Sequence, residues 1–389
     1  MKTLFSGYLL CGLLTFSLSA SATQVSVSGF GFAGNFASAA ERFPYTYKLF
    51  AQQKDSGQAA ATFSYQVIQK ARGIANPAFT FTPGDTVNLK NDTALMAVLM
   101  LTGETVAIDN HDTYHKTFIN LRGDTLIFDY KNQAIIRSCP VNVVLFDATP
   151  QRPTDERITG FVNDLIRRDD ANGLIAQSAQ CLARATAPAY GAKTVQVRKG
   201  VVAPEALALF PEPLRRHPEA ANAMLAGSLS SILSTKLGLS MLPDSIGHAI
   251  GGVMSMRLEN GDDIKLKLPE GDYVFDVSLN KFAKIKTAGT NVSTTYVYGA
   301  YMSLDLTEPM LGTSYIHTDL KNGEVAVVPA GQVDGDDFAA YQDAVRGLFL
   351  KLSDSVEKPN SKWLATAASV KTIESQLASA RETLGIKSK

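Results

Sequence analysis

The chain has 389 residues, with 37 Lys and Arg residues against 37 Asp and Glu residues, so its formal net charge at pH 7 is zero. This balance, without a long block of one sign, gives no electrostatic reason to expect a nucleic acid or an anionic membrane as a partner. The length exceeds what one hydrophobic core usually serves, which favours two domains.

The N-terminus has the residue order of a secretion signal. Lys2 precedes an apolar stretch, Leu4–Leu18, and the small residues Ala20–Ala22 follow it. Signal peptidases cleave after such a pattern, so we predict a signal peptide over residues 1–22. The remainder is then expected to be periplasmic or secreted, with no transmembrane segment after signal removal, because no later apolar stretch approaches the ~20 residues that cross a bilayer.

Two cysteines remain in the mature chain, since removal of the signal also removes Cys11. In an oxidising compartment such a pair favours one disulfide, which would join Cys139 to Cys181. The alternative is two small buried apolar side chains, because the sequence does not give the separation of the two Cα atoms. We predict the disulfide, since a helix over residues 172–185 would let Cys181 reach back to a strand end at Cys139.

The first half of the chain predicts strands, a helix broken by a proline, and then a small sheet. In chain order we expect a strand at Gln24–Ser28, a helix at Ala39–Gln53 split by Pro44, strands at Thr62–Lys70, Ala78–Phe81, Ala94–Leu101 and Thr105–Asp109, and three strands within Thr117–Ala148. An amphipathic helix follows Thr154, which is a good N-cap. Its apolar residues recur at helical spacing and are Ile158, Phe161, Val162, Leu165 and Ile166.

The second half predicts one long helix, several alternating strands and two terminal helices. The expected elements are a helix at Glu219–Leu237 stopped by Gly238, a hairpin of Val253–Glu259 and Asp263–Leu268 around Asn260–Gly261, strands at Tyr273–Leu279 and Tyr296–Thr307, a second hairpin of Thr313–Leu320 and Glu324–Val328 around Asn322–Gly323, a helix from Asp336 or Asp337 to Leu352, and a last helix at Trp363–Leu384. Alternation of this kind predicts antiparallel sheet with one face solvated.

Together these elements predict an α+β fold of two similar antiparallel-sheet-plus-helix units after a signal peptide, with a C-terminal helix. The boundaries are a signal peptide at 1–22, an N-terminal α+β domain at 23–190, a Pro-rich, irregular connection at 191–218, a C-terminal α+β domain at 219–358 and a helix at 359–389. A similar order of strands, turn and helix at Thr125–Ile166 and at Thr313–Leu352 suggests the hypothesis of an internal repeat.

One glycine motif is typical of dinucleotide binding but lacks the rest of its context. Gly29, Gly31 and Gly34 match G-x-G-x-x-G after a short strand. The acidic residue that should end a second parallel strand is missing, because Asp55 lies in a polar stretch. We expect a flexible aromatic loop here, and no cofactor.

Other candidate motifs have a plain structural explanation. His111 and His115 are four residues apart, but they fall between two strands, where a polar turn accounts for them. The acidic runs at 261–263 and 334–337 lack the spacing of a calcium loop. Ser278 and Lys281 match S-x-x-K on a strand, whereas that motif should open a helix. The sequence therefore predicts no catalytic, cofactor-binding or metal-binding residue.

Three classes of function remain. We favour an exported non-enzymatic cell-envelope protein that binds or helps assemble a protein partner, because the catalytic inventory is empty. The second class is a periplasmic small-ligand-binding protein with a cleft between the two units, which the aromatic residues Tyr296, Tyr298 and Tyr301 would line. The third is an exported hydrolase with an unrecognised site, whose candidate carboxylates are Asp129, Asp147, Asp276 and Asp305.

Overall fold

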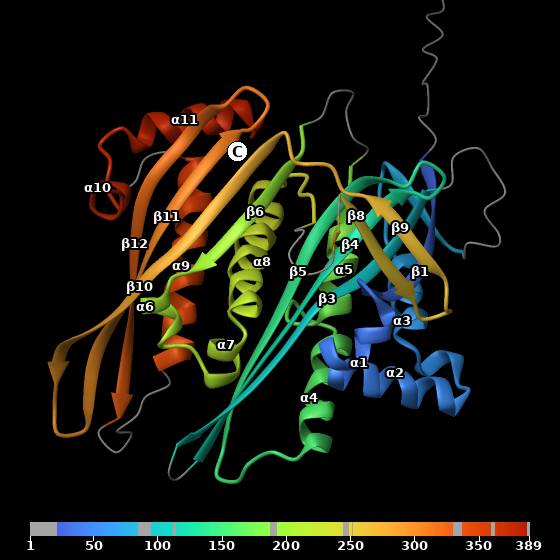
Figure 1. The fold of residues 1–389 in the computed structure, drawn as a ribbon, viewed down its shortest axis with the longest axis horizontal. Helices are drawn as coiled ribbons and strands as arrows, with labels where there is room; N and C mark the ends of the chain where they lie inside the picture. Colours follow the sequence, from blue (N-terminus) through green and yellow to red (C-terminus); the bar gives the residue numbers. More distant parts are fainter. Residues whose placement is uncertain are drawn as a thin grey trace, which may run out of the picture.

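The structure is a computed structural model that describes residues 22–84, 95–111, 114–186, 193–243, 249–250, 252–329, 337–358 and 362–386. It contains two β-sheets with helices packed against them (Figure 1). The predicted α+β fold class is therefore confirmed, and a helix, α11 (Ile373–Thr383), lies near the C-terminus. The predicted signal peptide lies outside the described residues, apart from Ala22.

The first sheet has the strand order β2-β1-β3-β4-β5-β9-β8-β7. Its strands are β1 (Thr23–Ala33), β2 (Phe79–Pro83), β3 (Leu95–His111), β4 (Tyr114–Asp129), β5 (Ala134–Thr149), β7 (Ala249–Ile250), β8 (Val253–Leu258) and β9 (Asp263–Lys267). One face is covered by α1 (Ala39–Arg42), α2 (Pro44–Ser56), α3 (Phe63–Arg72), α4 (Asp155–Arg167) and α5 (Leu174–Arg184). Alternate residues of β3, among them Leu99 and Leu101, are buried in the apolar core on this face.

Part of the first sheet closes on itself. The pairings run from β1 through β3, β4, β5, β9 and β8 and return to β1. This ring encloses a separate apolar core, whose larger side chains are Met96, Met100, Phe128, Met254, Met256 and Ile264. The β8–β9 hairpin comes from the segment predicted as the C-terminal domain, so the two halves of the chain are interlocked.

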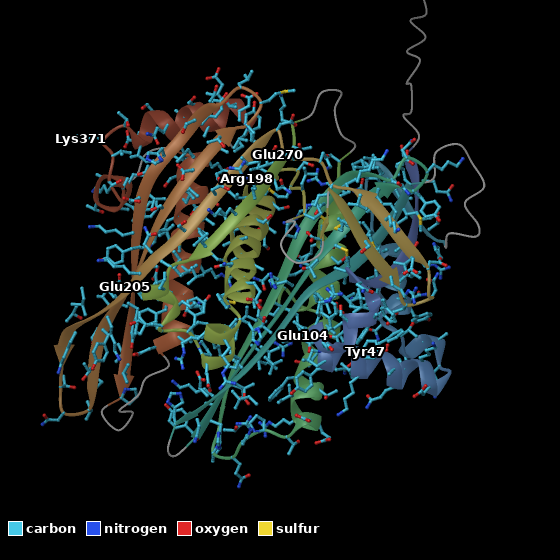
Figure 2. All side chains as sticks on the ribbon, in the orientation of Figure 1. Tyr47, Glu104, Arg198, Glu205, Glu270 and Lys371 are labelled. Atoms are coloured by element: carbon cyan, nitrogen blue, oxygen red, sulfur yellow. A yellow bond between two sulfur atoms is a disulfide. The ribbon has the colours of Figure 1, made fainter. Side chains whose placement is uncertain are left out.

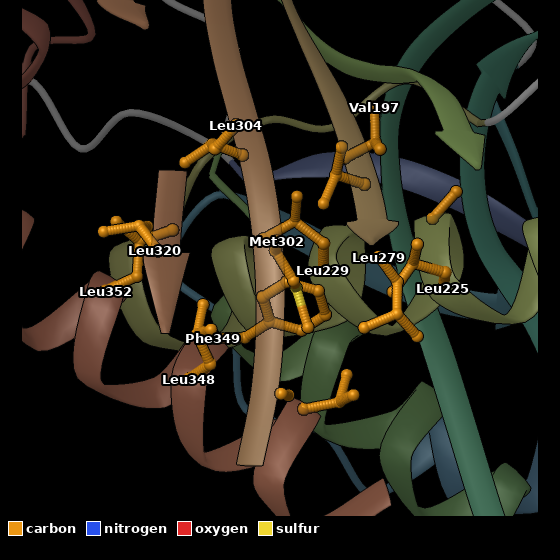
Figure 3. Close-up of a cluster of buried hydrophobic side chains, with 14 of the residues drawn as sticks. Val197, Leu225, Leu229, Leu279, Met302, Leu304, Leu320, Leu348, Phe349 and Leu352 are labelled. Carbon is orange, nitrogen blue, oxygen red and sulfur yellow. The ribbon is translucent and has the colours of Figure 1, made fainter. Parts of the chain in front are cut away.

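The second sheet has the strand order β12-β11-β10-β6. Its strands are β6 (Val195–Val202), β10 (Tyr273–Gly289), β11 (Ser293–Glu308) and β12 (Thr313–Pro329), and its helices are α6 (Pro204–Leu207), α7 (Glu212–Arg216), α8 (Pro218–Leu237), α9 (Asp337–Glu357) and α10 (Leu364–Ala367). In Figure 3, Leu229 of α8 and Phe349 of α9 lie around Met302 of β11, and Leu352 of α9 lies beside Leu320 of β12. Helix α8 also contacts β5, and it lies between the two sheets.

The two sheets share a strand order. In each, one strand runs parallel to the first strand of a three-stranded antiparallel meander, β1 beside β3-β4-β5 and β6 beside β10-β11-β12. Helices precede the meander and follow it in both halves. The internal repeat at Thr125–Ile166 and Thr313–Leu352 nevertheless stays a prediction, because shared strand order alone does not establish duplication.

The prediction of a strand at Thr62–Lys70 is wrong, because this segment forms helix α3 (Phe63–Arg72). Thr62 is the N-cap, since its side chain accepts a hydrogen bond from the backbone N–H of Tyr65. The buried residues Phe63, Val67 and Ala71 are four apart and form one stripe. This helical spacing was masked in the sequence by the β-branched and aromatic composition of the segment.

The second predicted hairpin is also wrong, because Thr313–Pro329 is one continuous strand. A tight hairpin at Asn322–Gly323 would need left-handed backbone at both residues, and neither has it. Gly323 instead leaves room for a neighbour, since a Cβ there would lie 2.9 Å from Cγ1 of Val297. The side chain of Asn322 donates to the carbonyl of Ala344 and so joins β12 to α9.

Two further segments differ from expectation in their local structure. Residues 191–218, expected to be irregular, contain β6, α6 and α7 within their described part. The single helix expected at Trp363–Leu384 is broken into α10 and α11, and the intervening Ala368 forms an isolated antiparallel bridge to Leu320 of β12.

Candidate functional site

The two predicted disulfide cysteines lie together. The sulfur atoms of Cys139 on β5 and Cys181 on α5 are 2.01 Å apart, and their Cα atoms are 6.2 Å apart, which is the geometry of a disulfide bond. A disulfide of this kind is compatible with an extracytoplasmic location. No helix in the described part of the chain is long and apolar enough to span a membrane.

The four candidate carboxylates do not form a common site. Asp129 accepts hydrogen bonds from the backbone N–H and the side chain of Asn132, and this bonding lowers the pKa of Asp129. Asp147 lies 3.5 Å from Arg157. Both residues belong to the first sheet, and each serves a local contact.

The other two carboxylates lie opposite each other on β10 and β11 of the second sheet. Asp276 binds Arg198, which also binds Glu270 (Figure 2). Asp305 binds Nδ1 of His317 and raises the pKa of that imidazole. This row lies on the solvated face of the sheet and not in a cleft. The hydroxyl of Ser303, on the same face of β11, donates to Asp319 and not to His317.

Gly29 and Gly31 lie inside strand β1 and Gly34 directly follows its last residue, so the prediction of a flexible loop at this motif is wrong. Gly29 has a φ of +94°, and a Cβ on it would lie 2.4 Å from Cβ of Ser64. The strand pairing shifts at this point, between Val27 and Gly29. The glycine is therefore needed for a bulge and for the close approach of α3, whose Ser64 hydroxyl accepts from the N–H of Phe30.

The remaining motifs also lie on strands or turns. His111 ends β3 and stacks on Tyr114 at 5.1 Å, and His115 lies on β4. Ser278 and Lys281 lie on β10. Among the described residues, no group of three His, Cys, Asp or Glu side chains could hold a metal ion. Part of the acidic run 334–337 lies outside those residues.

Two buried carboxylates were missed by the sequence analysis. Glu104 of β3 accepts hydrogen bonds from the backbone N–H groups of Tyr45 and Thr46 at 2.8 and 2.9 Å, and from the Thr46 hydroxyl at 2.6 Å (Figure 2). Glu259, which follows β8, accepts from the N–H of Ser64 at 2.6 Å. Burial raises the pKa of both carboxyls. They cap the first turns of α2 and α3, which is a structural role.

The three candidate tyrosines do not share one face. Tyr298 is buried and donates to Asp337 at 2.6 Å, and its burial and this bond raise its pKa. Lys284 neutralises Asp337 at 2.8 Å and lies over the ring of Tyr296. Tyr301 lies on the opposite face of β11, beneath Lys281.

A cleft of about 460 Å³ lies between the two units. Its walls come from the ends of β3, β4 and β5, from the segment between α6 and α7, and from the start of α9. The residues that line it are Ala107, Asp109, His111, Lys116, Thr117, Phe118, Phe146, Ala208, Leu209, Phe210, Pro211, Arg215, Asp337 and Phe338. A second hollow, of about 510 Å³ between α2 and α4, is lined mostly by polar side chains such as Gln52, Asn163 and Arg167.

The lower ends of β10, β11 and β12 project past the helices (Figure 1). On one face of this projection Ile285, Val297 and Val325 form a cross-strand row. Val327 lies two residues beyond Val325 on the same face. Ile285, Val325 and Val327 are 56%, 68% and 63% exposed, which is unusual for β-branched apolar side chains that lie this close together.

Strand β12 is the outermost strand of its sheet. Its upper half is covered, because the N–H of His317 donates to Gln376, the N–H of Asp319 donates to Ser369, and the carbonyl of Asp319 accepts from Ser369. Backbone groups of alternate residues point to the same side of a strand. The N–H and carbonyl groups of four further residues therefore point outward, and we call them the open edge: Lys321, Gly323, Val325 and Val327.

Within the described part of the chain, no backbone hydrogen bond from outside the sheet reaches Gly323, Val325 or Val327, and the antiparallel bridge between Leu320 and Ala368 flanks Lys321 at the upper end of the open edge. The pairing of β11 with β12 is regular from Ile316 to Pro329, so the alternation is unbroken along it. No protein-family model matches the chain, and no curated protein aligns with it significantly. The assignment of a function therefore depends on these two surfaces, the cleft and the open edge.

The open edge was not predicted from the sequence, and the cleft expected between the two units was given the wrong lining, because Tyr296, Tyr298 and Tyr301 do not line it. The cleft residues Phe118, Arg215 and Phe338 are about a hundred residues apart in the chain and follow no motif spacing. The sequence did predict a strand at Glu324–Val328, but its pattern does not indicate that this strand is the outermost one of a sheet. One signal of an unprotected edge was present in the sequence. The four residues before Pro329 carry no charge, whereas edge strands that are protected against pairing usually carry lysines.

Proposed function

We propose that the protein is an exported, non-enzymatic protein of the cell envelope that binds a partner protein at the open edge of β12. The partner contributes an extended segment of about six residues, which joins the second sheet as an additional strand. The predicted signal peptide and the disulfide support the exported location. The observation that carries the proposal is the row of outward N–H and carbonyl groups from Lys321 to Val327.

An exposed strand edge favours strand addition because each unpaired N–H and carbonyl gains a partner. The chain already uses this mode on itself, since Ala368 bridges to Leu320 in the antiparallel sense just above the open edge. A partner strand that pairs antiparallel to β12 would extend this pairing from Lys321 toward Val327.

The side chains around the open edge define the chemistry of the partner segment. Val325 and Val327 point to one face, together with Ile285, so the partner is expected to place β-branched or other apolar residues at alternate positions on that face. Lys321 lies on the same face at the upper end of the open edge and is exposed, so an acidic residue is expected opposite it.

A proline at position 325 tests the proposal. The N–H of Val325 points away from β11, so Val325→Pro removes a donor of the open edge without removing a hydrogen bond of the sheet. Val325→Thr keeps the N–H and the branched shape and is the matched control. We expect Val325→Pro to lower partner capture at least tenfold and Val325→Thr to leave it within twofold.

Capture is measured in cells with a photo-reactive residue at position 321, and the crosslinked peptide is identified by mass spectrometry. The same residue at Glu270, whose side chain binds Arg198 of β6 at the opposite edge of the sheet (Figure 2), is the positional control. Purified complex should also show slowed amide exchange at 321–327. Equal capture by Val325→Pro, or crosslinks only between copies of this chain, would contradict the proposal.

A further inference from the structure

We propose that the cleft between the two units binds a small aromatic anion. This site is separate from the open edge of β12 and would serve a second binding activity of the protein. The cleft volume, about 460 Å³, lies in the range of small-molecule sites.

The floor of the cleft is a chain of aromatic rings that joins the two units. Phe118 of β4 contacts Phe146 of β5 and Phe338 of α9, both at 5.1 Å between ring centroids. Phe338 in turn contacts Phe210 at 5.1 Å. Phe146 is 38% exposed and Leu209 is 46% exposed, so part of this apolar surface is open to a ligand. An aromatic ring placed there would gain edge-to-face contacts and lose water contact.

The charges around the floor favour an anion. Asp337 is already neutralised by Lys284, which lies 2.8 Å away. Asp109 lies directly opposite Lys116 in the pairing of β3 with β4. Arg215 of α7 has no carboxylate within 4 Å among the described residues, and one of its terminal nitrogens donates to the carbonyl of Phe210. Its remaining N–H groups can bind a carboxylate or a sulfonate at the rim.

Arg216 provides a matched control for Arg215. It follows Arg215 on the same helix and is exposed, but it binds Glu212 and does not line the cleft. Arg215→Gln and Arg216→Gln therefore remove the same charge from the same short helix, and only the first removes it from the cleft.

The test uses two fluorescent probes that differ mainly by one anionic group, 1-anilinonaphthalene-8-sulfonate and the neutral N-phenyl-1-naphthylamine. We expect Arg215→Gln to weaken sulfonate binding about tenfold and to leave the neutral probe unchanged, whereas Arg216→Gln changes neither. Phe146→Ala should weaken both probes, because it removes part of the aromatic floor. Thermal melts confirm that each variant is folded.

The proposal is overturned if Arg215→Gln and Arg216→Gln weaken sulfonate binding equally, because the effect would then come from the lower positive charge of the protein and not from the cleft. It is also overturned if Phe146→Ala leaves both probes bound, or if Val327→Ser abolishes binding, because the probes would then occupy the projection at β12. These outcomes are independent of partner capture, so the two proposals can fail separately.

Discussion

Glu104 supplies a helix cap that the local sequence of α2 cannot provide. The N-cap residue is Phe43, which has no side-chain hydrogen-bond acceptor, and Pro44 follows it. The carboxylate reaches the free N–H groups of the first turn from β3, about sixty residues along the chain. Its burial costs free energy when it is ionised, which raises its pKa.

This raised pKa predicts a pH dependence of stability. In the folded state Glu104 keeps its proton to a higher pH than in the unfolded chain, so its contribution to stability is fully present below the unfolded pKa and is lost as the pH rises through the folded pKa. Wild-type stability relative to Glu104→Gln should therefore fall as the pH is raised above about 4.5, by up to about 1.4 kcal/mol per pH unit within that window.

Urea unfolding of both proteins at several pH values from 4 to 8 measures this difference. The exposed Glu205 (Figure 2) lies on the first turn of α6, and Glu205→Gln is the control that should follow the wild-type curve. A constant offset between wild type and Glu104→Gln at every pH would show that the carboxyl does not change its proton affinity on folding.

At the scale of elements, the disulfide joins strand β5 to helix α5 across a sequence separation of 42 residues. The segment between its ends includes the rest of β5 and all of α4, so the bond holds both helices against the sheet. A closed loop of this length restricts the unfolded chain.

Replacing both cysteines with Ala should lower the free energy of unfolding by about 4 kcal/mol, from the loss of loop closure. Denaturant unfolding measures the change, and chemically reduced wild-type protein is the control that should lose a similar amount. If the double variant and the oxidised wild type unfold at the same denaturant concentration, then the bond is not formed in the folded protein.

For the whole molecule, the decisive feature is that each unit depends on elements of the other. The β8–β9 hairpin completes the ring of strands in the first unit, and α8 contacts both β5 and β6. The chain division predicted at 190 and 219 therefore does not separate two independent sets of contacts, although the predicted boundaries themselves stay a prediction.

This interlocking predicts one cooperative unfolding transition for the whole protein. The single tryptophan, Trp363, lies in the second unit beside α10, so its fluorescence reports on that unit, whereas far-ultraviolet circular dichroism reports on both. The two midpoints should coincide. Met256→Ala, in the core of the ring, should shift the Trp363 transition as much as the circular dichroism transition, at a cost of about 2–5 kcal/mol. Two separate midpoints would show that the units unfold independently.

Local patterns in the sequence determined the fold class, most of the strands, the helices α4 and α8, and the pairing of the two cysteines. The helices depend on residues close together in the chain, such as the cap at Thr154 and the glycine stop at Gly238, whereas the cysteine pairing followed from the count of two cysteines after the predicted signal peptide. Predictions from local patterns were wrong where a distant contact outweighed the local turn preference. Gly323, for example, packs against Val297 instead of making a turn.

Only the tertiary structure decided which strand lies at an edge, which carboxylates are buried and where the cleft forms. The open edge exists because β12 ends the strand order, and the cleft exists because Phe118, Phe210 and Phe338 meet from three distant segments. Such features depend on the packing of whole elements against one another. A single sequence contains no local signal of that packing, since residue spacing along the chain does not record which elements become neighbours.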